Sequence, residues 1–555
     1  MELQIWMGRA GAGKSRLVLE TIEKRRGQRP QVLLVPEHAS HEAELDLCRA
    51  CGPTASRDAE VLSFRNLATR VLGQVGGLAD VTLDNGGKLL TMRRALQEVS
   101  GRLTVFARPS QRPAFLRQLV ALADELHAYR VTPEQLMAQV ADMDGAAGEK
   151  LRSAALIYGA YDARLRGDGF DARSRVQKLC DALPASDYLA GKDVYVDGFS
   201  YFNRVEEDIL ATALRQAESL TVTLLGDESD PQLFQNALRQ RERLKRMAAL
   251  AHSKCTVEVL VSKNDGALAH LERCFFGGEE PWQGEEPPVR LYQAETAFSE
   301  MEFVAAQVRR LAREGCRWRD IGVAARNMEV YGPLLEAVFR RDGIPAYISR
   351  RSDILEKPVL TMLLSAVDAV TGGFEYEDVF RCLKTGMAGI TAAECDVLEN
   401  YVIRWEIRGG MWLRETDWTA SPDGYGAELN EVRRQRLAEV NAVRRRVRGL
   451  FYDLSEGLKA GETVRDKAEV LYMFAESAGV PETLERQTAA LYDDGQVQLA
   501  EEYRQLWSIF CGVLDQFVEL LGDVEVDGQE FARLLRLVLS QYAVATIPAT
   551  LDQVK

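Results

Sequence analysis

The sequence has few of the residues that build metal centres and disulfide frameworks. Its 555 residues include only five histidines, none of them paired at ligand spacing, and nine scattered cysteines. Cys48 and Cys51 form one C-x-x-C, but they lie in a helical pattern and no second pair follows at zinc spacing. Buried free thiols are therefore favoured over a zinc site.

Long apolar runs and an excess of positive charge are also missing. No uninterrupted apolar run approaches the ~18 residues that a membrane-spanning helix needs. The net charge is −14, which excludes a general polyanion binder and confines any nucleic-acid site to a local basic surface. The N-terminus predicts a strand and a glycine-rich loop instead of a signal peptide. We therefore expect a cytoplasmic protein without a membrane partner, and the length predicts roughly three or four domains.

The strongest motif lies in the first fifteen residues. Residues 3–7 (LQIWM) predict a short buried strand, and a helical pattern begins near Leu17. Between them stands GRAGAGKS, with the G-x-x-x-x-G-K-S spacing of a P-loop. The predicted nucleotide-binding residues are Gly8, Arg9, Ala10, Gly11, Ala12, Gly13, Lys14 and Ser15.

The chemistry of phosphate binding explains these residue types. Glycines let the backbone curl so that several N–H groups point at one phosphate, and the helix start adds its positive dipole end. Lys14 would contact the β- and γ-phosphates of ATP, and the Ser15 hydroxyl would bind Mg²⁺. The alternative is an ordinary glycine-rich turn, which seldom matches all these positions between a strand and a helix.

The predicted strands alternate with helices, as in a doubly wound parallel sheet. After the first strand, further strands are predicted at residues 31–35, 61–64, 194–197 and 220–225. Asp197 ends the fourth, where a P-loop sheet holds its Mg²⁺-binding carboxylate. The alternative is a turn-forming aspartate before Gly198.

Two long segments are helical and poor in strands, and each interrupts an α/β domain. A linker is predicted at 277–288, and strands at 289–292, 321–325 and 344–348 would open the second α/β domain, with a further strand starting within 546–555. The predicted limits are 1–88 and 191–286 for the first domain, 89–190 for its helical insertion, 287–358 for the second domain, 359–543 for its helical insertion, and 544–555 for the start of the return to that domain.

The second helical segment carries a run of arginines. This arginine run is either a solvated helix face interrupted by glutamates or a contact surface for nucleic acid. Its members are Arg433, Arg434, Arg436, Arg444, Arg445, Arg446 and Arg448.

The order of motifs resembles that of superfamily 1 helicases. GRAGAGKS resembles motif I, and VLSFRNLATRVL (61–72) resembles the segment that such helicases lay against single-stranded DNA. VYVDGF (194–199) sits at the Walker B position, LLGDESD (224–230) at motif III and residues 321–348 at motif IV.

The closer resemblance is to the AddB subunit family of the AddAB-type helicase–nucleases. It rests on the starting P-loop strand, VPEH (35–38), VDGF (196–199) and LDQV (551–554), and covers essentially the whole chain. The resemblance implies the N-terminal half of a longer protein. The family's nuclease domain, with its iron–sulfur cysteines, would lie beyond Lys555.

This resemblance implies an α/β fold of two RecA-like P-loop parallel-sheet domains, each with a large all-helical insertion. It implies ATP and Mg²⁺ as cofactors, with Arg326 joining the nucleotide site, and Ser63, Phe64 and Arg65 facing DNA. The implied partners are double-strand DNA ends, single-stranded DNA and an AddA-type helicase–nuclease subunit. The implied function is an ATP-binding scaffold that reads a recombination hotspot during repair of double-strand breaks.

Departures from the helicase pattern concern hydrolysis. Superfamily 1 motors carry Asp-Glu at the Walker B site, whereas Asp197 is followed by Gly198, and Glu206 and Glu207 lie further along. Asp230 stands where motif III usually has glutamine, and no adenine-reading glutamine segment precedes the P-loop. Loss of a positioned general base typically costs ~10²–10⁴-fold in rate. We therefore expect a site that holds nucleotide but hydrolyses it poorly. The alternatives are an autonomous ATP-driven DNA translocase and, disfavoured by the two helical insertions, a P-loop kinase.

Overall fold

The structure is a computed structural model. The described residues are 2–77, 83–103, 105–106, 113–167, 175–261, 266–276, 280–284, 289–348, 352–544 and 552–555. Contacts divide the chain into two compact units, Met1–Thr82 with Ala121–Leu291 and Leu83–Val120 with Tyr292–Lys555. The domain limits predicted from the sequence stay predictions, and most of the predicted linker at 277–288 lies outside the described residues.

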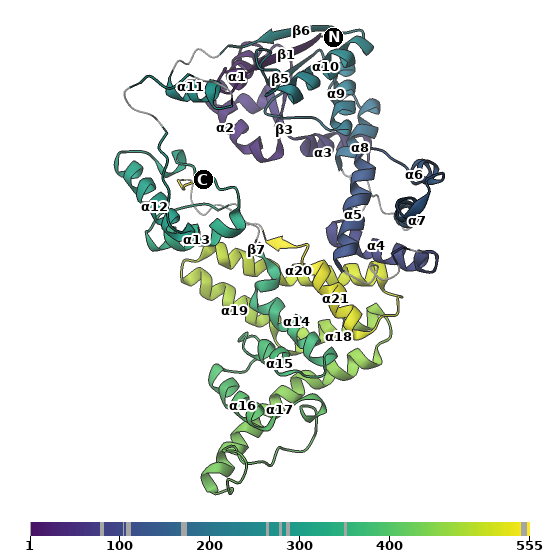
Figure 1. The fold of residues 1–555 in the computed structure, drawn as a ribbon, viewed down its shortest axis with the longest axis vertical. Helices are drawn as coiled ribbons and strands as arrows, with labels where there is room; N and C mark the ends of the chain where they lie inside the picture. Colours follow the sequence, from purple (N-terminus) through teal and green to yellow (C-terminus); the bar gives the residue numbers. More distant parts are fainter. Residues whose placement is uncertain are drawn as a thin grey trace. The chain divides into compact units, whose positions relative to one another are not determined.

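The first unit is built on a six-stranded parallel sheet with the order β3-β2-β4-β5-β1-β6 (Figure 1). The strands are β1 (Glu2–Gly8), β2 (Gln31–Leu34), β3 (Ala59–Leu62), β4 (Asp193–Val196), β5 (Ser219–Leu225) and β6 (Lys254–Val259). The predicted parallel sheet and its first five strands are confirmed. The sixth, β6, is an exposed edge strand and lacks the continuous apolar run of strands buried on both faces.

Helices cover both faces of this sheet, because successive side chains of a strand point to opposite faces. Leu3, Ile5 and Met7 of β1 pack in a core with α3, α8, α9 and α10, whereas Trp6 packs with α1 and α2. The helices of this unit are α1 (Lys14–Lys24), α2 (Ser40–Cys51), α3 (Phe64–Val75), α6 (Pro133–Val140), α7 (Gly145–Gly167), α8 (Arg175–Ala182), α9 (Arg204–Gln216), α10 (Gln235–Leu250) and α11 (Ala267–Cys274).

The second unit is mainly helical. Its helices are α4 (Asn85–Val99), α12 (Ala297–Arg313), α13 (Met328–Arg341), α14 (Pro358–Thr371), α15 (Tyr376–Leu383), α16 (Ala392–Trp405), α17 (Glu431–Ala460), α18 (Val464–Ser477), α19 (Val480–Asp493), α20 (Val497–Leu521) and α21 (Gly528–Leu539). A two-residue antiparallel pair joins β7 (Ser352–Asp353) to β8 (Ala543–Val544), and the boundary between the units falls within α5 (Pro113–Ala128). Among the described residues, no helix combines the length and apolarity required to cross a membrane.

The region around α12 and α13 departs from its predicted pattern. Both helices form as predicted and pack around a small core that includes Val554. The predicted strands at 289–292 and 321–325 are wrong, and 344–348 keeps a single parallel bridge, from Ala346 to Val554. A strand needs a partner along its length, and these segments find only isolated bonds, such as Val323 N to Lys555 O at 2.8 Å. Residues 545–551, where the last predicted strand would begin, lie outside the described residues.

Candidate nucleotide site

The glycine-rich loop joins the end of β1 to the start of α1, as its motif predicts. Two glycines are required by the local geometry. Gly13 precedes the helix with a φ of 83°, a left-handed conformation that side chains disfavour. A Cβ on Gly8 would lie 2.6 Å from the carbonyl oxygen of Leu260, which follows β6. The loop therefore keeps a tight, backbone-lined shape between the carboxyl ends of the strands.

Lys14 and Ser15 occupy the first turn of α1. The Lys14 ammonium donates hydrogen bonds to the carbonyl oxygens of Gly8 at 2.7 Å and Arg9 at 2.8 Å, so the side chain lies back over the loop. Burial lowers the pKa of Lys14, and the carboxylates of Asp197 and Glu272 oppose that shift. The two carboxylates favour the charged form of Lys14, which is the form that binds a phosphate, while the Ser15 residue is exposed.

Asp197 directly follows β4, two strands away from the P-loop strand. Its backbone N–H donates to Leu34 O at 2.9 Å, and its carboxylate accepts a hydrogen bond from the Thr223 hydroxyl of β5, the strand between β4 and β1. Gly198, with a φ of 82°, supplies the turn that follows. The carboxylate is thus held by the strand between β4 and the P-loop strand, and its role as a Mg²⁺ ligand stays a prediction.

Two carboxylates beside the loop were not among the predicted site residues. Arg9 Nε donates to Asp227 Oδ2 at 2.6 Å, and Arg9 Nη1 lies 3.6 Å from Glu272 Oε1 of α11. The hydrogen bond from Arg9 is the main cause that lowers the pKa of Asp227. Asp227 belongs to the LLGDESD segment, which marked the region, whereas Glu272 has no sequence signal because it lies far along the chain in an ordinary amphipathic helix.

These residues line a cleft of about 280 Å³. It opens at the carboxyl ends of β5, β1 and β6, where ligands of open α/β sheets bind. Its wall consists of Gly8, Arg9, Ala10, Gly226, Asp227, Ser229, Val259, Leu260, Val261, Ala269, Glu272 and Arg273.

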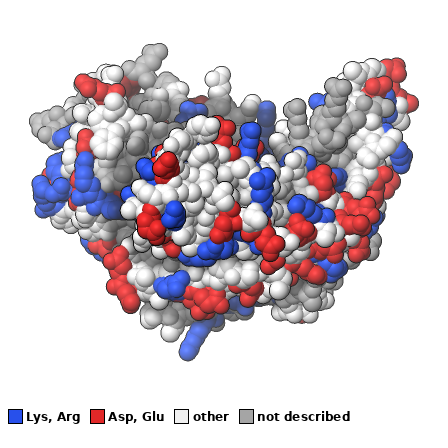
Figure 2. All heavy atoms as spheres, turned by 90° about the horizontal axis from the view of Figure 1, so that it is seen from below, with Lys and Arg blue, Asp and Glu red and all other residues white. Residues whose placement is uncertain are grey.

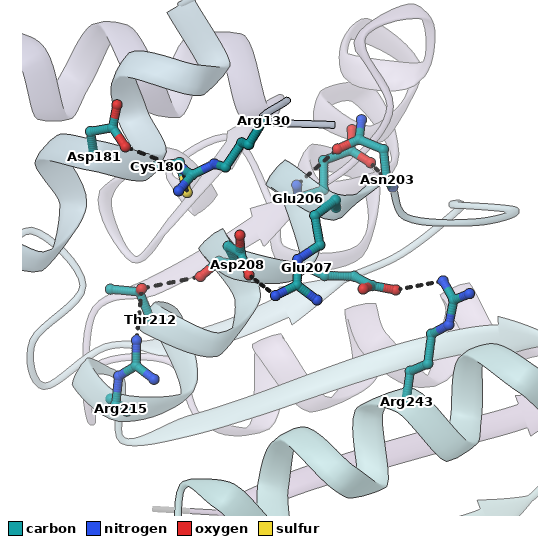
Figure 3. Close-up of polar contacts among 11 residues, drawn as sticks. Arg130, Cys180, Asp181, Asn203, Glu206, Glu207, Asp208, Thr212, Arg215 and Arg243 are labelled. Atoms are coloured by element: carbon teal, nitrogen blue, oxygen red, sulfur yellow. Dashed lines mark hydrogen bonds and ion pairs between the residues drawn. The ribbon is translucent and has the colours of Figure 1, made fainter. Parts of the chain in front are cut away.

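Glu206 and Glu207, in the first turn of α9, have other partners (Figure 3). Glu206 accepts a hydrogen bond from the Asn203 backbone at 2.9 Å, and the Asn203 side chain accepts from Glu206 N, also at 2.9 Å, which together form a capping box. Glu207 accepts from Arg243 at 3.0 Å and from Gln240 at 3.2 Å. Both carboxylates therefore have structural roles at the helix start and against α10.

The three residues predicted to face DNA differ in exposure. The Ser63 side chain is buried and caps α3 by accepting a hydrogen bond from Asn66 N at 3.1 Å. Phe64 is buried in the core and contacts the Phe199 ring, with ring centroids 5.3 Å apart. Arg65 is exposed and lies 3.4 Å from Glu37. Contact with DNA stays a prediction for all three, and Arg65 is the one whose charged group reaches the surface.

Arg326 and the two cysteines of the C-x-x-C do not line the cleft. Arg326 is exposed just before α13 in the second unit, and its predicted role at the nucleotide site stays a prediction. Cys48 and Cys51 both lie on α2 as free cysteines. Cys51 is buried as predicted, and desolvation raises the pKa of its thiol to about 11, but Cys48 is exposed, so the prediction of a buried thiol is wrong for Cys48.

The arginine run of α17 is held by its own chain. Residues 389–431 supply most of the partners, and Arg444 is fully buried beneath them. Arg433 and Arg436 pair with Asp423, Arg434 with Glu431, Arg444 and Arg445 with Asp417, Arg446 with Glu394 and Gly389 O, and Arg448 with Leu413 O. Figure 2 views the end of the molecule where α16 and α17 lie and shows both signs of charge interspersed there. The arginine run is therefore neither a simple solvated face nor a free basic patch.

Comparisons with known proteins agree with the order of motifs. The family described as "ADDB, N-terminal" matches residues 5–272, which contain the P-loop, Asp197 and all the residues that line the 280 Å³ cleft except Arg273. The B subunit of the ATP-dependent helicase/deoxyribonuclease of Desulforudis audaxviator is 34% identical over 586 residues, covering 100% of this chain and 50% of that protein. The proteins of the same name from Acetivibrio thermocellus and Caldanaerobacter subterraneus subsp. tengcongensis are 32% and 31% identical, over 100% of this chain and 50% and 49% of theirs. The chain thus spans about half the length of these relatives.

Proposed function

Because this chain belongs to the AddB family, we propose that it is an ATP- and DNA-binding subunit of a heterodimeric helicase–exonuclease that processes double-strand DNA ends for recombinational repair. It acts mainly as a scaffold and reader of a hotspot sequence, while an AddA-type partner supplies most of the motor activity. The name of the relatives, which describes one subunit of a helicase/deoxyribonuclease, supports the subunit role. The proposal that this subunit hydrolyses ATP poorly rests on the contacts that the carboxylates around the P-loop make.

In this proposal the backbone N–H groups of Gly8–Ser15 and the Lys14 ammonium bind the phosphates of ATP. The oxygens of Ser15 and Asp197 are the hard donors that Mg²⁺ prefers, and the Thr223 hydroxyl fixes the Asp197 carboxylate in position. The metal would neutralise charge on the phosphates. Arg326 would join this site from a second RecA-like domain, to which α12 and α13 would belong.

The carboxylates near this site are poorly placed to activate water. Gly198 replaces the usual glutamate, and Glu206 and Glu207 are used in the α9 cap and the contacts with α10. Asp227 is held by Arg9 with a lowered pKa, which weakens it as a base, and Glu272 lies against the same guanidinium. ATP binding would therefore stabilise the fold or the DNA-bound state more than it drives movement.

The test uses the full-length heterodimer with its AddA-type partner, because the chain spans half of its relatives. We expect removal of the AddB-type subunit to weaken binding to double-strand DNA ends and to abolish the response to a hotspot sequence. Binding that is indifferent to its removal would reject the proposal. Arg65→Ala, compared with Arg70→Ala on the same helix, tests whether the exposed guanidinium of α3 contributes to that binding.

An autonomous DNA translocase is the second candidate, because the P-loop is complete and Lys14 is well placed. DNA-stimulated ATP turnover of the full-length subunit alone separates the two. Turnover on the order of 1 s⁻¹ or faster, within the usual range of enzymes, and abolished by Lys14→Ala, would favour the translocase. Turnover at least ~100-fold slower, with ATP binding intact, is the result expected for a scaffold.

A further inference from the structure

The position of the cleft relative to Asp197 indicates which part of a nucleotide it could hold. The strand β1 lies between β5 and β6, and Asp197, the proposed Mg²⁺ ligand, lies on the β5 side. The 280 Å³ cleft begins at Gly226 and Asp227 after β5 and extends past β1 to Leu260 and Val261 after β6 and to Glu272 of α11. A nucleotide with its terminal phosphates and metal toward Asp197 would leave its nucleoside end on the side of this cleft.

We propose that this cleft binds the ribose and base of a nucleoside triphosphate and that Glu272 accepts hydrogen bonds from the ribose hydroxyls. The inference rests on the proposed nucleotide site at Gly8–Ser15 and adds the part of the ligand that the P-loop motif leaves unassigned. Whole small-molecule pockets are about 300–1,000 Å³, so 280 Å³ suits the nucleoside part of a ligand whose phosphates lie outside the cleft.

Hydrogen-bonding groups in the cleft have capacity left for a ligand. Arg9 Nη1 is buried and has no hydrogen-bond acceptor among the described residues, although Glu272 Oε1 lies 3.6 Å away. Asp227 is more fully occupied, since its two oxygens accept from Arg9 Nε at 2.6 Å and Ser229 N at 2.8 Å. Asp227 therefore positions Arg9, whereas the Glu272 carboxylate can exchange its long contact for a hydroxyl donor.

The chemistry of the cleft favours a nucleoside over an inorganic anion. Asp227 and Glu272 offset the two arginines of the cleft, so no excess positive charge is left for a further phosphate, whereas a carboxylate accepts hydrogen bonds well from neutral hydroxyls. Val259 and Val261 give one wall an apolar surface against which a base can pack. Arg9 and Arg273 balance the two carboxylates, so the cleft itself carries no excess of either sign.

The experiment measures binding to the full chain by isothermal titration calorimetry. The ligands are Mg·ATP, Mg·2′,3′-dideoxy-ATP and Mg·tripolyphosphate, which share the phosphates but differ in hydroxyls and nucleoside. The proteins are wild type, Glu272→Gln, Ala269→Leu and the control Glu44→Gln. Glu44 is exposed on α2 and takes no part in the cleft, whereas leucine at 269 fills the cleft while keeping a good helix former.

We expect ATP to bind the wild type about tenfold more tightly than either analogue, since a hydrogen bond to a charged group is worth about that factor. Glu272→Gln should remove most of the preference over dideoxy-ATP, and Ala269→Leu should weaken ATP but not tripolyphosphate. Glu44→Gln should match the wild type.

Equal affinity of the wild type for all three ligands, or equal loss for all three in Glu272→Gln, would overturn the nucleoside cleft while leaving phosphate binding at the P-loop intact. Absence of binding by ATP and tripolyphosphate alike would instead reject the proposed nucleotide site itself. Circular dichroism of each variant verifies that α11 and the sheet are retained, so a weakened titration is attributable to the cleft.

Discussion

The P-loop and the arginine run of α17 are both cationic features that the sequence offers as sites for phosphate. They differ in the structure in how far their cationic groups are already paired within the chain. The P-loop is eight residues long, its first three residues line a cleft, and the Lys14 ammonium lies over the loop, hydrogen-bonded among the described residues only to backbone carbonyl oxygens of Gly8 and Arg9. The arginine run has seven guanidiniums, and each of them contacts carboxylates or carbonyl oxygens of its own chain. The arginine run has more cationic groups than the P-loop, but they are already paired within the chain.

The difference follows from the partners that each group finds within the chain. Glycines let the P-loop backbone curl so that its N–H groups can point at a ligand, although Ala12 N already donates to Arg9 O at 3.2 Å within the turn. Long arginine side chains reach partners on the neighbouring loop, and Arg444 even lies over the Trp418 ring, 5.1 Å from its centroid. The arginine run therefore fixes the segment 406–430, which has little regular secondary structure of its own, against α17.

Arg444→Ala should give the largest effect in this comparison. The side chain is fully buried, it donates to Arg414 O, and burial lowers its pKa. Its removal leaves a cavity and an unsatisfied carbonyl, and we expect a loss of about 3 kcal/mol in the free energy of unfolding. Urea unfolding followed by tryptophan fluorescence measures this loss, because Trp412 and Trp418 lie in the same cluster.

The matched variants sharpen this prediction. Arg444→Met keeps the volume without the buried charge and should cost far less than alanine, because buried ions are often replaceable by apolar groups of similar size. Arg445→Ala removes an exposed partner of Asp417 and should stay within about 1 kcal/mol. Equal losses for Arg444→Ala and Arg445→Ala would contradict a structural role based on burial.

Lys14→Ala should lower the affinity for Mg·ATP by about 10- to 100-fold with little change in stability, because charge-assisted bonds to phosphate are lost. Lys24→Ala, at the exposed end of the same helix, is the control and should leave the affinity unchanged. Titration calorimetry measures both. A parallel loss in the two variants would mean that general charge, and not the P-loop geometry, attracts the nucleotide.

The P-loop site was predictable where the signal was local. Gly8, Lys14 and Ser15 lie within one motif, and that motif fixes strand, turn and helix together. Glu272 was not predictable, since it reaches Arg9 only after the chain has built β6 and returned through α11. The burial of Ser63 and Phe64 was not predictable either, because their position in a motif says nothing about burial.

In the fold, too, features with a local sequence pattern were predictable and those that depend on distant partners were not. Five of the six strands were predictable from apolar runs, and in the four interior strands burial on both faces leaves a continuous pattern. The edge strand β6 lacks a continuous apolar run, and the pattern at 344–348 predicted a strand where only the bridge at Ala346 forms, because pairing depends on partners distant in sequence. The contacts of the arginine run are also unpredictable from α17 alone, since they depend on where Asp417, Asp423 and Glu394 come to lie.

Arg446→Ala should change DNA binding of the full heterodimer by less than about twofold, because its guanidinium is already held by Glu394 and Gly389 O. Affinities measured across a range of salt concentrations test this. A contacted phosphate contributes about 0.9 to the slope of log affinity against log salt. A fall of that size in Arg446→Ala would show that the arginine run exchanges its internal partners for DNA.

Glu206→Gln should give the smallest effect, and its sign depends on pH. Desolvation raises the pKa of Glu206 in the folded chain, so ionised Glu206 is a cost that appears as pH rises from the ordinary glutamate pKa of about 4.3 through the raised folded value. Glutamine preserves the capping box with Asn203, so this variant should equal the wild type below pH 4 and become slightly more stable at pH 7. Thermal unfolding of both proteins across this range measures the difference. A variant less stable at pH 7 would mean that the charged cap at the start of α9 is worth more than its desolvation, and that the carboxylates around α9 are positioned for their charge.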